Sequence, residues 1–198
     1  ITLFDFGVEL EPGDLLEQMT RTLPEGTIRR YGLPDVLDGI DTLLQERDSG
    51  YRQFVVIFGL NRARRLLVQP DIYSVAPKNK LIELLQTGPE NGMNFIVWAN
   101  SAEGFMENYG EALGSFEHRL VSDIQEEQYN IFTYAPAPGS MKPKNAVYFN
   151  LDNTENPKLR LYEKPSAAWT GQFIRSMEHA LAEKKRAEKN KPNDTEWW

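Results

Sequence analysis

The chain has 198 residues, no cysteine and a formal net charge of −7. A chain of this length fits one α/β domain with a substantial core. The lack of cysteine excludes a disulfide framework and a thiolate metal site, and it agrees with a reducing, cytoplasmic location. No apolar run approaches the roughly 18 residues that a membrane span needs, so we expect no membrane contact from this segment. The negative charge argues against a cationic surface over the whole chain, so local patches decide any contact with nucleic acid.

Strand-like and helix-like segments alternate along most of the chain. The segments with apolar residues at helical spacing are 14–19, 34–48, 80–88 and 103–116. Between them lie short apolar runs that predict strands, near Leu3, Ile28, Val56, Ile96 and Leu120. Strands separated by helices of this length predict an α/β fold with a parallel sheet and helices on both faces.

The last part of the chain has a different composition. Residues 135–145 are rich in Pro, Gly and Lys and predict a loop, and two short strands around a turn predict a hairpin near Val147 and Leu159. Ser166 can cap a last helix from about Ala167 to Lys189. We therefore expect one domain over residues 1–165, followed by a C-terminal helix and a loose tail over residues 166–198.

One long run resembles a known family. From Lys80 to Phe132 the chain has a helix that ends near a Gly, the strand GMNFIVWANSAE, a second helix and the strand EHRLVSDI. This order resembles the C-terminal half of the motor domain of RecA-like ATPases of the FtsK/SpoIIIE type. FVVIFGLNRARRL falls where that family has its Walker B strand, and ITLFDF where it has the strand after the P-loop helix. The resemblance implies a RecA-like, P-loop NTPase-type sheet and a role in DNA translocation within a larger protein.

Two parts of that family are missing from the sequence. The P-loop G-x-x-x-x-G-K-[ST], which holds phosphates, is absent, and the resemblance places it upstream of Ile1. The Walker B strand should end in a carboxylate that holds Mg²⁺, but the matching residues are Phe58, Gly59 and Leu60. We expect no cofactor and no ATP hydrolysis for this chain alone, and ATP with Mg²⁺ only in a full-length protein that has a P-loop. Because the P-loop strand is central in the family, its absence should leave a gap with unpaired backbone groups.

Two groups of residues are candidates for a site. Asp5, Asn100 and Ser101 follow strand ends, where α/β folds bind ligands, and Arg119 falls at an Arg of the family. These four are candidates for nucleotide or sensor contacts, and each has a structural alternative as a cap, a turn residue or an ion-pair partner. The second group are candidates for contact with DNA or a neighbouring subunit, with a solvated helix start as the alternative for the arginines: Arg62, Arg64, Arg65, Lys142 and Lys144. His118 and His179 have no spaced ligands around them, so no metal site is expected.

Acidic residues gather between positions 103 and 127, where Arg119 alone opposes them: Glu103, Glu107, Glu111, Glu117, Asp123, Glu126 and Glu127. DNA phosphates avoid such a surface, which suits a protein partner better.

Three functions stay open. The first is an FtsK/SpoIIIE-like module that couples nucleotide to DNA translocation in a larger protein, itself degenerate in catalysis and able to form homo-oligomers with other copies. The second is a non-catalytic module of a secretion-type or defence-type relative that recognises a protein. The third is an unrelated α/β enzyme that uses Asp5 or Asp123 as an acid or base. The expected partners are DNA, other domains of the same polypeptide and a protein bound to the acidic face.

Overall fold

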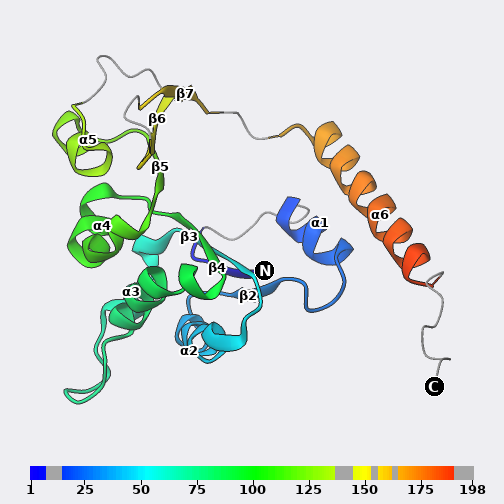
Figure 1. Cartoon of the computed structure of the whole chain (residues 1–198), viewed down its shortest axis with the longest axis horizontal. Coiled ribbons are helices and arrows are strands. Elements are labelled where there is room, and N and C mark those ends of the chain that lie inside the picture. Colours follow the sequence, from blue (N-terminus) through cyan, green and yellow to red (C-terminus); the bar gives the residue numbers. More distant parts are fainter. Residues whose placement is uncertain (8–14, 137–144, 153–155, 162–164, 190–198) are drawn as a thin grey trace. The chain divides into compact units, whose positions relative to one another are not determined.

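The computed structural model describes residues 1–7, 15–136, 145–152, 156–161 and 165–189. It divides the chain into two compact units, Ile1–Val8 with Ile28–Tyr162 and Glu9–Thr27 with Glu163–Trp198. The first unit contains two sheets and the helices that pack on them, whereas the described part of the second is a pair of helices (Figure 1).

The larger sheet of the first unit is parallel, with its strands in the order β2-β1-β3-β4. Its strands are β1 (Thr2–Asp5), β2 (Arg29–Tyr31), β3 (Gln53–Phe58) and β4 (Met93–Trp98). Parallel neighbours need a crossover, and α2 (Val36–Glu46) and α3 (Pro77–Thr87) provide those from β2 to β3 and from β3 to β4. The prediction of an α/β fold with a parallel sheet is therefore confirmed for these four strands.

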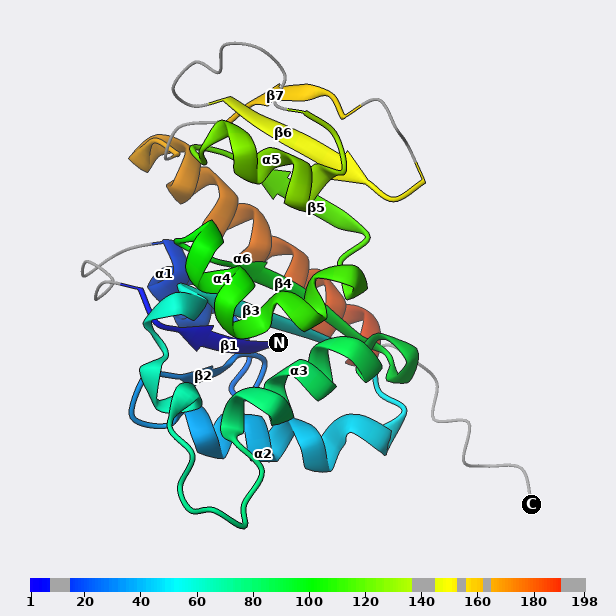
Figure 2. The ribbon, with the colours of Figure 1, turned by 90° about the vertical axis from the view of Figure 1, so that its left-hand side faces the viewer.

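Three helices cover one face of this sheet. The helices α2, α3 and α4 (Ala102–Tyr109) share one apolar core with the strands, as Figure 2 shows for α2 and α3. The packing is close at Gly39 of α2, where a Cβ atom would lie 2.6 Å from the ring of Phe4. Central residues of this core are fully buried, and among them are Val36, Leu43, Val55, Leu60, Leu66 and Leu84.

The opposite face of the sheet carries exposed apolar side chains. The register places Asp5, Phe58 and Trp98 side by side, so these side chains share a face. Phe54 and Ile96 belong to the same face, and both are exposed along with Phe58 and Trp98. Within the described part of the first unit, the helices thus cover one face of the sheet, where the sequence predicts helices on both.

The smaller sheet corrects one strand prediction. β5 (His118–Val121) pairs antiparallel with β6 (Asn145–Asn150), which pairs antiparallel with β7 (Lys158–Arg160). The predicted hairpin near Val147 and Leu159 is therefore confirmed, but the run near Leu120 does not join the parallel sheet. Exposed and buried residues alternate along β5, a pattern typical of an antiparallel strand with one solvated face.

Other elements differ from the predictions in detail. The helix predicted over residues 103–116 changes at Gly110 into a 3₁₀ segment, and α5 (Glu126–Thr133) was not predicted. The expected internal gap is also absent, because β1 pairs directly with both β2 and β3. Among the described residues, the outermost strands of this sheet are β2 and β4, and each has one open edge. The 3₁₀ segments are η1 (Arg47–Ser49), η2 (Leu60–Arg62), η3 (Arg64–Leu67), η4 (Pro89–Asn91) and η5 (Gly110–Ser115).

The second unit pairs α1 (Leu15–Thr22) with α6 (Ala167–Lys189). The predicted cap of α6 is confirmed, because the Trp169 N–H donates to Ser166 Oγ at 3.2 Å. Trp169 and Phe173 stack with ring centroids 5.3 Å apart. No helix in the described part of the chain is long and apolar enough to cross a membrane.

Candidate functional site

The carboxyl ends of β1, β3 and β4 lie next to one another at the same end of the parallel sheet. This is where open α/β sheets bind ligands. The residues at these ends are Asp5, Phe58 and Trp98, which are neighbours in the register. Each strand end is followed by a turn, so the chemistry of the site depends on those turns.

Asp5 is engaged within the chain. Its side chain is 6% exposed and forms an ion pair of 2.7 Å with Arg30. Its other carboxylate oxygen accepts the Gly7 N–H at 3.0 Å. Both oxygens therefore hold the turn after β1 against β2. This is the structural role, as a cap, that the sequence analysis gives as the alternative to a ligand contact for Asp5.

The end of β3 has no carboxylate. Phe58 lies on the open face with its ring 5.7 Å from that of Trp98, and Leu60 is fully buried. Gly59 has a φ of +79°, and its N–H donates to the Trp98 carbonyl. A Cβ atom at Gly59 would lie 3.2 Å from the backbone of Phe6, so the close approach of the turn after β1 favours glycine here.

The turn after β4 is held by a residue that the sequence analysis missed. The Asn61 side-chain oxygen accepts the N–H groups of Asn100 at 2.9 Å and of Ser101 at 3.2 Å. Ser101 Oγ in turn accepts the Gly104 N–H at 3.1 Å and caps α4. The Asn100 side chain is exposed at the same turn. Asn61 stands two residues after the left-handed Gly59, and asparagine at such a turn is the signal that could have indicated its capping role.

The three arginines after β3 lie on the surface in different states. Arg65 donates to the Pro34 carbonyl. Arg62 and Arg64 are exposed, and neither forms an ion pair with a carboxylate of the described residues. These two guanidinium groups are available to a phosphate or a partner. The predictions for Lys142 and Lys144 lie outside the described residues.

Arg119 lies in β5 of the smaller sheet and is 7% exposed. It donates to the backbone carbonyls of Phe116 at 3.0 Å, Phe132 at 2.9 Å and Leu113 at 3.0 Å. Its guanidinium carbon also lies 4.7 Å from the centroid of the Phe149 ring and 5.1 Å from that of Tyr134. Arg119 thus ties η5 and α5 to the smaller sheet in this structure.

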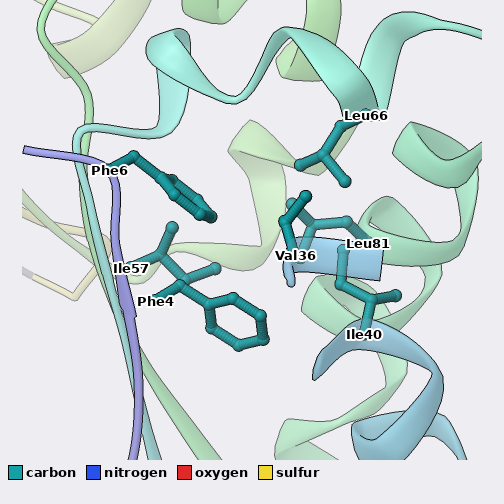
Figure 3. Close-up of a pocket in the computed structure, with 7 residues that line it drawn as sticks. All are labelled: Phe4, Phe6, Val36, Ile40, Ile57, Leu66 and Leu81. Carbon is teal, nitrogen blue, oxygen red and sulfur yellow. The ribbon is translucent and has the colours of Figure 1, made fainter. Parts of the chain in front are cut away.

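An apolar gap too small to hold a water molecule lies between β1, β3, α2, η3 and α3 (Figure 3). Its lining has no polar side chain that could orient a nucleotide, so it is part of the core. The residues of the lining are Phe4, Phe6, Val36, Ile40, Ile57, Leu66 and Leu81. Among the described residues, no group of three or more His, Asp or Glu side chains is arranged to hold a metal ion.

Comparison with protein-family models, curated proteins and solved structures found no match to this chain.

Proposed function

We propose that this chain is part of an FtsK/SpoIIIE-like, RecA-like module that is degenerate in catalysis and supplies binding surfaces to DNA-related work in a larger protein. The observation that carries the proposal is the end of β3 in a parallel sheet, where Phe58, Gly59 and Leu60 stand at the positions that the resemblance gives to Walker B. Without an acid there, the module lacks an anchor for Mg²⁺. ATP and Mg²⁺ would be bound, if at all, through a P-loop elsewhere in the full-length protein.

The two edges of the parallel sheet support the RecA-like assignment. β2 is short and charged, and its Arg29 pairs with Glu46 of α2, which also lowers the pKa of Glu46. β4 has six residues, all but Asn94 apolar, and its apolar side chains lie on both faces, a pattern typical of a strand that is buried on both faces. A long apolar edge is a template for pairing. In the proposed module, the P-loop strand pairs with β4 there.

Titration of the 198-residue chain with Mg-ATP tests the proposal. With neither phosphate cradle nor Mg²⁺ anchor, we expect a Kd weaker than about 1 mM and a flat calorimetric trace. Micromolar binding or measurable hydrolysis by this chain would contradict the proposal.

Hydrogen exchange tests whether a further strand pairs with β4. The measurement compares the 198-residue chain with a polypeptide that is extended by its natural upstream sequence. The Gln53 N–H donates to Gly92 O and the Gly59 N–H to Trp98 O, so the alternate N–H groups of Phe95 and Val97 face the open edge. We expect these two amides to exchange fast in the 198-residue chain and to be protected in the extended one. Fast exchange in both would mean that no strand is added at β4.

The unpaired arginines provide the test for DNA. If Arg62 and Arg64 contact phosphates in the larger protein, Arg62→Ala with Arg64→Ala should weaken binding evenly across sequences and flatten the salt slope by about two. Arg52→Ala is the matched control, because Arg52 is also exposed and forms no ion pair in the described residues. An unchanged salt slope would remove DNA contact from these arginines.

That outcome would favour the second candidate, a module that recognises a protein. The observation in its favour is the row of exposed carboxylates at Glu103, Glu107 and Glu111, none of which forms an ion pair among the described residues.

A further inference from the structure

The loop between η3 and α3 exposes large apolar side chains. It consists of residues 68–76 and projects beyond the rest of the first unit in both views, below the label α3 (Figures 1 and 2). Ile72 is 82% exposed and Tyr73 is 92% exposed, and Leu67, Val68 and Val75 are exposed beside them. Single exposed apolar residues are ordinary, but a projecting group of this kind marks an interaction site.

The tip of this loop has a defined shape. Asp71 accepts the N–H groups of Tyr73 at 2.7 Å and of Ser74 at 2.9 Å, and these bonds lower the pKa of the Asp71 carboxyl. The Gln69 side chain donates to the Ser74 carbonyl at 3.1 Å. The backbone of the tip is therefore already hydrogen-bonded, so little order has to be gained when Ile72 and Tyr73 bind a partner.

A second exposed surface, which carries acidic side chains, lies at the other end of the first unit. There α5 presents Glu127 and Ile131, which share one helix face by their spacing and are both exposed. Tyr134, which ends α5 with a left-handed φ of +53°, is exposed next to them. Glu126 and Asp123 are exposed next to them. Both views show the loop and α5 at opposite ends of this unit (Figures 1 and 2).

We propose that the apolar loop of one copy of this chain docks on α5 of a second copy. Ile72 and Tyr73 pack against Ile131 and Tyr134, and the arginines at the base of the loop face the carboxylates around α5. Among the described residues, Arg62, Arg64, Glu126 and Glu127 are exposed without an ion-pair partner, so both sets are free to pair across the contact. Because the two surfaces differ, the contact is head-to-tail and can continue from copy to copy.

A lipid surface fits the loop less well. The ionised Asp71 lies at the tip between Pro70 and Ile72, where insertion would bring a charge into the membrane. A protein surface leaves the same carboxylate in water at the rim of the contact. The docking needs neither nucleotide nor DNA and is measured without them, although it uses Arg62 and Arg64, whose contact with DNA is tested above.

The test measures self-association of the 198-residue chain by sedimentation velocity over a range of concentrations. We expect association that grows with concentration, and we expect Ile72→Asn with Tyr73→Asn to weaken it about 30-fold or more, as for central anchors of an interface. Tyr51→Asn is the matched control, since Tyr51 is 77% exposed on a different part of the unit.

A charge exchange identifies the surfaces. Arg62→Glu with Arg64→Glu should abolish self-association, and so should Glu126→Lys with Glu127→Lys, because each variant then opposes like charges. An equal mixture of the two variants should associate again, since every contact in an alternating assembly pairs opposite charges. A monomeric wild-type chain at all concentrations would overturn the proposal, and so would association that persists in either variant. Binding of the wild-type loop to vesicles of anionic lipid, without self-association, would assign it to a membrane instead.

Discussion

Replacement of Arg119 by methionine is expected to lower the free energy of unfolding by about 3–5 kcal/mol. The guanidinium is buried and donates to three backbone carbonyls, those of Leu113, Phe116 and Phe132. Methionine fills a similar volume but donates no hydrogen bond, so those carbonyls lose their partner in a place that water reaches poorly. Urea unfolding followed by circular dichroism measures the change.

The matched control for this variant is Arg52→Met. Arg52 is exposed and forms no ion pair in the described part of the chain, so its replacement should change stability by less than about 0.5 kcal/mol. Arg119→Lys is informative as well, because one ammonium group cannot reach all three carbonyls. If Arg119→Met were as stable as the control, the three bonds would not hold η5 and α5 to the smaller sheet.

The parallel sheet could be predicted from the sequence because its strands are apolar runs separated by amphipathic helices. Val55 and Ile57 of β3 point into the core, and even the open face of that strand carries Phe54 and Phe58. β5 has four residues, as the parallel strand β1 does, and nothing in its local sequence distinguishes it from a parallel strand. Its partner is β6, which pairs Leu120 with Tyr148 far along the chain. Which sheet β5 joins therefore depends on a contact between residues far apart in the sequence, and the local sequence pattern does not show that contact.

The site was predictable only in part, for a related reason. Residue type places Asp5, Asn100 and Ser101 at strand ends, and the structure brings their turns to one edge of the sheet. Residue type does not reveal that Asp5 forms an ion pair with Arg30, or that the Asn61 side chain holds the turn after β4. Arg119 is the clearest case, because its acceptors are backbone carbonyls, which every residue possesses.

Gly59→Ala is expected to destabilise the chain by about 2–4 kcal/mol, although it adds a single methyl group. Two costs combine at this position. The backbone is left-handed, with φ at +79°, and the added Cβ would lie 3.2 Å from the backbone of Phe6. Gly50→Ala is the control that separates the backbone cost from the steric cost, because Gly50 has a φ of +74° but no atom within 4 Å of an added Cβ. Gly50→Ala should therefore show only the conformational cost, about 1–2 kcal/mol.

The midpoints of urea unfolding of these two variants test whether the end of β3 can accept a side chain. Equal losses would mean that the turn at Phe6 moves aside and that conformation alone favours glycine at position 59. A larger loss for Gly59→Ala would mean that any residue with a Cβ, aspartate and glutamate included, displaces the turn after β1. In that case the close contact between the turns after β1 and β3 is the reason that position 59 has no acidic side chain. An acid introduced there by substitution would displace the turn after β1 and disturb the end of the sheet where it would have to bind Mg²⁺.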